Sequence, residues 1–109
     1  MSIYWKIFTD AGSEEKAEKV ASTTIKTIGV IGDNLDVNPY HKGGFTCSFE
    51  SDPETSEWCN TVLTTISLAQ NIGRSYTLNG DISSELDMWS NESTVSGVTN
   101  IQVITRKKA

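Results

Sequence analysis

The sequence is poor in the residues that build disulfide frameworks and membrane spans. Its 109 residues include only two cysteines, Cys47 and Cys59, which is too few for a disulfide-stapled fold. No stretch approaches the roughly 20 apolar residues that span a bilayer, and the N-terminus lacks the basic and apolar regions of a signal peptide. We therefore expect a single reduced domain, residues 1–109, in the cytoplasm and away from the membrane.

Residues that carry chemistry are also scarce. His41 is the only histidine, and a general base needs an oriented partner, so we expect a solvated loop residue. His41, Cys47 and Cys59 lie in three separate predicted elements, without metal-ligand spacing. The acidic segment 81–87 lacks the spacing of a calcium loop. We therefore expect no enzyme, no metal and no cofactor, and we expect both cysteines to be small buried side chains.

Basic residues are nearly missing from the segment 43–105. Between Gly43 and Thr105 there is one, Arg74, against eight carboxylates, a formal charge of −7 in a chain of −5. Such a surface repels nucleic acid and attracts cationic partners. The alternative is that these acids only keep the protein soluble. The eight carboxylates are Glu50, Asp52, Glu54, Glu57, Asp81, Glu85, Asp87 and Glu92.

Two segments have the pattern of amphipathic helices. The first begins after Ser13, a suitable N-cap, and ends at Gly29. The second is predicted to begin at Asp52 and Pro53 and to end at Gly73. Apolar residues recur at helical spacing in both. They are Ala17, Val20, Ala21, Thr24, Ile25 and Ile28 in the first, and Trp58, Cys59, Val62, Leu63, Ile66, Ala69 and Ile72 in the second.

Other segments alternate with the period of two that is typical of half-buried strands. They are residues 3–8, 45–50, 76–78, 86–89 and 101–104, with a weaker strand over 30–37 that Pro39 ends. The order of elements predicts an α+β two-layer sandwich, in which two helices pack on one face of a mainly antiparallel sheet of about five strands. The opposite face is left for water or a partner.

The segment from Gly80 to Glu92 is the strongest candidate for a binding surface. It combines carboxylates with Trp89, and interfaces use aromatic side chains as anchors. The alternative is an edge hairpin whose acids prevent strand pairing. Alternation places Glu50, Asp87 and Trp89 on the uncovered face of the sheet. The predicted partner-binding residues are Glu50, Glu57, Glu85, Asp87, Trp89 and Glu92.

In size, charge and element order the chain resembles the immunity proteins of bacterial toxin systems, including those of contact-dependent inhibition. The resemblance rests on no motif, and no residue is carried over from it. It implies a monomer or weak homodimer that binds a cognate toxin domain, commonly a basic nuclease, and covers its active site. A carboxylate surface can replace the phosphate that such a site expects, and complementary charge speeds encounter.

The alternative is a small-molecule-binding or regulatory domain of ferredoxin-like type, which is expected to hold a pocket between helices and sheet. Ionic strength separates these hypotheses, since charge-steered protein binding weakens in salt whereas an apolar pocket hardly responds.

Overall fold

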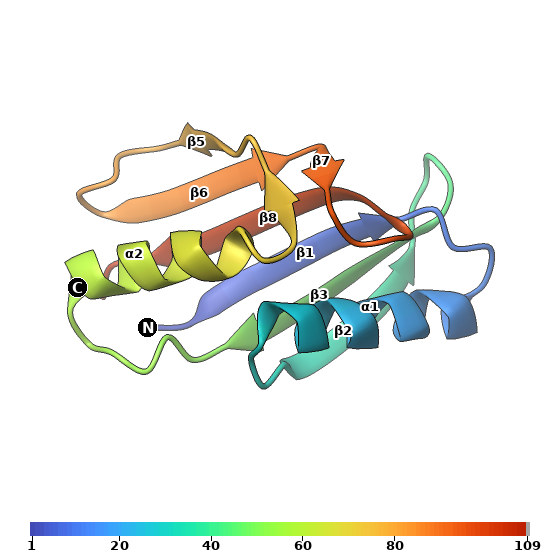
Figure 1. Ribbon diagram of the computed structural model, residues 1–109, viewed down its shortest axis with the longest axis horizontal. Coiled ribbons are helices and arrows are strands. Elements are labelled where there is room, and N and C mark those ends of the chain that lie inside the picture. Colours follow the sequence, from blue (N-terminus) through green and yellow to red (C-terminus); the bar gives the residue numbers. More distant parts are fainter. Residues whose placement is uncertain (109) are drawn as a thin grey trace.

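The computed structural model describes residues 1–108 and has two layers, a six-stranded sheet and two helices on one of its faces (Figure 1). This confirms the predicted α+β sandwich. The helices are α1 (Glu14–Ile28) and α2 (Trp58–Ala69). The strands of the large sheet are β1 (Ile3–Thr9), β2 (Asp33–Pro39), β3 (Phe45–Ser51), β5 (Thr77–Asn79), β6 (Glu85–Ser90) and β8 (Val98–Arg106), and β4 (Gly73–Arg74) pairs with β7 (Glu92–Ser93) in a separate two-stranded sheet.

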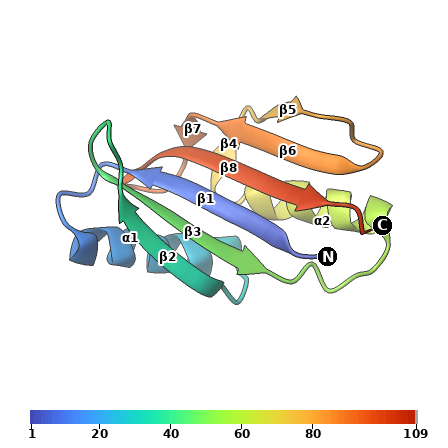
Figure 2. The same ribbon diagram turned by 180° about the vertical axis from the view of Figure 1, so that it is seen from behind.

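All strand pairs are antiparallel, in the order β2-β3-β1-β8-β6-β5. The part β2-β3-β1-β8, with α1 after β1 and α2 after β3, is the split β-α-β arrangement of ferredoxin-like folds. The β5–β6 hairpin is inserted between α2 and β8 and extends the sheet beyond β8 (Figure 2). The three-residue β5 is the edge strand, so the β5–β6 segment is an edge hairpin, as the alternative hypothesis expected. β6 itself is paired on both sides from residue 87 to residue 89.

Alternation along the strands was predicted correctly and builds the core. Ile3, Trp5 and Ile7 of β1 are fully buried on the helix-covered face. The Trp5 ring stacks on Phe49 of β3, with ring centroids 6.2 Å apart. Its indole Nε1 donates a hydrogen bond of 2.9 Å to Ser51 Oγ, so the only polar atom of this buried side chain is satisfied.

Helix α1 follows its predicted pattern. The Ser13 hydroxyl accepts a hydrogen bond from the Lys16 backbone N–H, and Gly29 ends the helix with a φ of 87°. A left-handed backbone at this position favours glycine, because other side chains are strained there. The buried residues of α1 are Ala17, Ala21, Thr24 and Ile28.

Helix α2 begins later than predicted. Asp52 does not cap it, because its carboxylate accepts the backbone N–H of Glu54 at 2.8 Å, and Glu54 has a φ of 58°. These contacts form a local turn, an alternative that aspartate offers the chain. The helix starts at Trp58 and ends at Ala69, and Gly73 belongs to β4.

The buried face of α2 also differs from the predicted apolar stripe. Thr61 and Thr65 are fully buried, whereas Leu63 is 66% exposed and Cys59 is exposed. The two threonine hydroxyls donate to the carbonyls of Glu57 and Thr61, at 3.0 and 2.7 Å. Because each hydroxyl is satisfied within the helix, it can be buried without an unpaired polar atom.

Candidate functional site

The two helices leave the other face of the sheet uncovered (Figure 2). We call this surface the open face, and its side chains come from alternate positions of neighbouring strands. The strand register assigns to it Tyr4, Lys6 and Phe8 of β1, Asp33, Asp36 and Asn38 of β2, Thr46, Ser48 and Glu50 of β3, Thr77 and Asn79 of β5, Glu85, Asp87 and Trp89 of β6, and Asn100, Gln102, Ile104 and Arg106 of β8.

Strand β6 supplies the most prominent aromatic side chain of the open face. Leu86 and Met88 point to the core and are buried, so Asp87 and Trp89 point the other way, as predicted. The Trp89 side chain is 44% exposed, and Tyr4 on β1 is 37% exposed. Large apolar rings on a solvent-facing sheet are unusual and are typical of contact surfaces.

The open face brings together four of the six predicted partner-binding residues: Glu50, Glu85, Asp87 and Trp89. Asp87 pairs with Ile104, Ile104 with Tyr4, and Tyr4 with Glu50. Strands lie ~4.8 Å apart, so the carboxylate-bearing positions 87 and 50 are separated by about 14 Å across the sheet. Both carboxylates can therefore contact one protein partner.

The other two predicted residues lie elsewhere. Glu57 is exposed at the N-cap position of α2, in the helix layer. Glu92 is exposed on β7, where it pairs with Arg74 of β4. The acidic segment of the sequence is thus divided between different sides of the molecule, and the strands of the open face carry five carboxylates and two cations.

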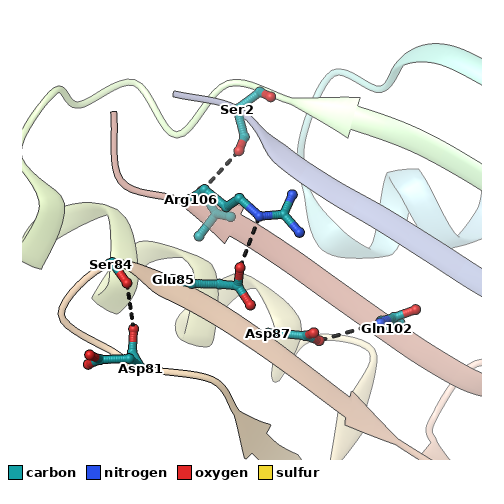
Figure 3. Close-up of polar contacts among 8 residues, drawn as sticks. Ser2, Asp81, Ser84, Glu85, Asp87, Gln102 and Arg106 are labelled. Carbon is teal, nitrogen blue, oxygen red and sulfur yellow. Dashed lines mark hydrogen bonds and ion pairs between the residues drawn. The ribbon is translucent and has the colours of Figure 1, made fainter. Parts of the chain in front are cut away.

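Two of the open-face carboxylates differ in how they are held. Glu85 Oε2 forms an ion pair of 2.9 Å with Arg106 Nε, whereas Asp87 accepts only a long hydrogen bond, 3.4 Å, from Gln102 Nε2 (Figure 3). Within residues 1–108 no cationic side chain forms an ion pair with Asp87. The Asp87 carboxylate therefore keeps acceptor positions for a partner.

The turn before β6 is ordered by Asp81. Its carboxylate accepts hydrogen bonds from the Ser83 hydroxyl, at 2.8 Å, and from the Ser83 backbone N–H, at 3.0 Å. The same two bonds lower the pKa of Asp81. Its backbone carbonyl accepts from Ser84 (Figure 3) and Glu85, so this carboxylate fixes the start of β6 and is not free for chemistry.

Sequence reasoning missed a hollow at one end of the open face, with a volume of about 840 Å³. Three aromatic residues, Phe8, Tyr40 and Trp89, line it together with two acidic residues, Asp10 and Asp87. The one feature of the sequence that pointed to this hollow was the Gly43-Gly44 pair, but two glycines alone could not show which strands their loop would contact. Its other lining residues are Thr9, Lys42, Gly43, Gly44, Asn79, Thr99, Asn100, Ile101 and Gln102.

The turn between β2 and β3 forms one wall of this hollow because Gly44 allows it to approach β1. Gly44 has a φ of 74°, and a Cβ at this position would lie 1.9 Å from the carbonyl oxygen of Thr9. This close approach lets the Tyr40 ring pack edge-on against Phe8, at 5.2 Å between centroids. The Lys6 ammonium also lies over the Phe8 ring, 5.3 Å from its centre.

The cysteines and the histidine have different surroundings. Cys47 is buried, as predicted, but Cys59 is exposed because its side of α2 turns away from the sheet. Burial, together with the charge of Glu18, raises the pKa of the Cys47 thiol from its ordinary 9.0 to about 11. His41 lies exposed in the β2–β3 turn beside Tyr40. Residues 1–108 hold no group of three or more histidine, cysteine, aspartate or glutamate side chains placed to bind a metal ion.

Comparison of the chain with known protein families, with curated proteins and with solved structures finds no match. Among residues 1–108, no helix has the length and apolar character needed to cross a membrane.

Proposed function

We propose that this protein is a binding inhibitor of the immunity-protein kind, which neutralises a basic toxin domain, such as a nuclease, by covering its active site with the open face. The observation that carries the proposal is that α1 and α2 leave one whole face of the sheet open. This face presents the exposed rings of Trp89 and Tyr4 together with Asp87, a carboxylate that has no ion pair within residues 1–108. Aromatic side chains anchor interfaces. Carboxylates give electrostatic complementarity to a site that expects phosphate.

The proposal is tested by affinity capture from the native lysate with three tagged proteins. One is the wild type, the second carries Trp89→Ala and Asp87→Lys on the open face, and the third carries Leu63→Ala and Glu57→Lys on the helix side as the matched control. We expect the wild type and the control to retain the same basic protein, and the open-face variant to lose it. Washing at high salt weakens this retention, because exposed charges are screened.

The captured protein is then identified, purified and assayed for toxicity or nuclease activity with and without this chain. We expect stoichiometric wild-type protein to abolish that activity and the open-face variant to leave it. Equal retention by all three proteins would contradict the assignment of the open face. A captured partner whose activity is unchanged by binding would contradict inhibition.

A second candidate, a small-molecule-binding domain, is favoured by the hollow itself, which combines three rings with polar groups. The hollow lies on the open face and not between helices and sheet, where this hypothesis placed a pocket. A ligand in it would raise the melting temperature of the wild type, with little dependence on ionic strength. Trp89→Ala would remove that rise.

A further inference from the structure

The hollow at the end of the open face has the composition of a site for a cationic side chain. Three aromatic and two acidic residues line it, against one basic residue, Lys42, in the β2–β3 turn. Aromatic faces attract cations through their quadrupole, and tryptophan does so most strongly. A neutral apolar ligand would leave the charge of Asp87 without an ionic partner, because no cationic side chain within residues 1–108 pairs with it.

Asp87 and Trp89 are placed to act together. They are two residues apart on β6 and therefore share the open face, about 6.8 Å apart along the strand. The Asp87 carboxylate has only the long bond to Gln102 Nε2, and Gln102 is also the cross-strand partner of Trp89. A flat cation lying over the Trp89 ring can thus reach the Asp87 carboxylate.

The chain already contains one such contact, since the Lys6 ammonium lies over the Phe8 ring beside the hollow. This cation is directed at Phe8, whereas Trp89 remains 44% exposed and is in no aromatic or cation contact within residues 1–108. Trp89 and Asp87 are therefore the aromatic ring and the carboxylate that are available to a cation from a partner.

We propose that the hollow receives an arginine side chain of the protein partner, whose guanidinium stacks on Trp89 and donates to the Asp87 carboxylate. Arginine fits better than lysine, because its planar group both stacks on rings and forms paired hydrogen bonds with a carboxylate. The inference rests on the proposed function, of which it specifies the contact.

The test uses the peptide acetyl-Gly-Arg-Gly-amide as a probe, titrated into isotopically labelled full-length protein and followed by nuclear magnetic resonance. We expect the indole N–H signal of Trp89 and the side-chain amide of Gln102 to move. The indole N–H of Trp58 donates to the Ile82 carbonyl at 2.8 Å on the helix side, so its signal is the internal control and stays in place.

Two comparisons test whether binding depends on the charge of the arginine and on the carboxylate of Asp87. A peptide with citrulline in place of arginine has nearly the same shape without the charge, and we expect it to shift neither signal. Asp87→Asn keeps the shape of this half-buried side chain and is expected to weaken arginine binding about tenfold, as for loss of a charge-assisted hydrogen bond. Glu57→Gln, in the helix layer, is the matched control and leaves the affinity unchanged. Equal shifts with citrulline, or full affinity in Asp87→Asn, would overturn the proposal.

These outcomes are distinct from those of the capture experiment. If the open face retains a basic protein but the arginine peptide fails, the arginine site is wrong and the inhibitor function stands. If the peptide binds but the open face retains no protein, the site stands and the inhibitor function is wrong.

Discussion

At the scale of single residues, some side chains of the acidic segment are available to a partner, whereas others are engaged in contacts within the protein. Asp87 keeps acceptor positions and Trp89 keeps an exposed ring, whereas Glu85 is paired with Arg106 and Asp81 orders its own turn. The carboxylates of the acidic segment are alike in sequence, and only their neighbours distinguish them. The residue that we expect to control partner binding is therefore Asp87.

The buried thiol of Cys47 makes a prediction for pH dependence. Its pKa is about 11 in the folded protein and 9.0 ordinarily, because burial and, to a lesser extent, Glu18 disfavour the thiolate. Above pH 9.0 the unfolded chain loses this proton while the folded protein keeps it, so stability is complete below that value and falls as pH rises. The expected slope is about −1.4 kcal/mol of unfolding free energy per pH unit.

Urea unfolding at about pH 8 and about pH 9.5 measures this slope while tyrosine ionisation, with an ordinary pKa near 10, is still minor. Tyr76 is also buried, and burial raises its pKa above the ordinary value. Cys47→Ala is expected to remove most of the slope, and Cys59→Ala, at an exposed thiol, to preserve it. A slope that survives in Cys47→Ala would assign the effect to another group.

At the scale of elements, helix α2 buries the hydroxyl groups of Thr61 and Thr65, although Leu63 and Cys59 of the same helix are exposed. The Thr65 hydroxyl donates to the Thr61 carbonyl, which already accepts within the helix, so the bond adds little net stability. We expect Thr65→Val to change the free energy of unfolding by less than about 0.5 kcal/mol, since the shape is kept. Thr65→Ala is expected to lose about 1–2 kcal/mol through the cavity that it leaves.

The matched control is Thr27 of α1, whose hydroxyl makes the same bond to the Thr23 carbonyl but lies exposed. Thr27→Ala is expected to be neutral or slightly stabilising, because alanine is the better helix former. Denaturant unfolding compares the three variants. A loss above about 2 kcal/mol in Thr65→Val would show that the hydroxyl itself stabilises the helix.

Strands were more predictable than the second helix because alternation is enforced by the core, whereas helix starts depend on competing local bonds. Ile3, Trp5 and Ile7 must all lie on one side of their strand once that side is buried, so the pattern allows only one orientation of the strand. The motif Asp52-Pro53-Glu54 is compatible with two local structures, a helix cap or a turn, and the carboxylate of Asp52 forms the turn. The hollow could not be predicted, since it depends on the contact between Gly44 and Thr9 across the sheet.

At the scale of the whole molecule, part of the acidic charge lies away from the contact surface. The acidic run of the sequence reaches the helix layer at Glu57 and the small sheet at Glu92, while the rings lie on the open face. Long-range attraction depends on the total charge, and short-range contact depends on the open face. The two contributions should therefore appear in different rate constants.

This separation predicts the kinetics of binding to the captured partner. Reversing both distant charges, Glu57→Lys with Glu92→Lys, changes the formal net charge from −5 to −1 and is expected to lower the association rate constant severalfold. It should leave dissociation unchanged, since neither side chain lies on the open face. Trp89→Ala should instead raise the dissociation rate constant at least about tenfold, with little effect on association, because loss of an anchor acts on the bound state.

Surface-based kinetic measurements at about 0.02 M and about 0.3 M salt distinguish the two effects, because screening removes the first and not the second. The association rates of the wild type and the charge-reversed variant are expected to converge at high salt. Faster dissociation of the charge-reversed variant would mean that the partner also contacts the helix layer or the β4–β7 pair. In that case the interface would extend beyond the open face, and all six acidic and aromatic positions predicted from the sequence would share one surface.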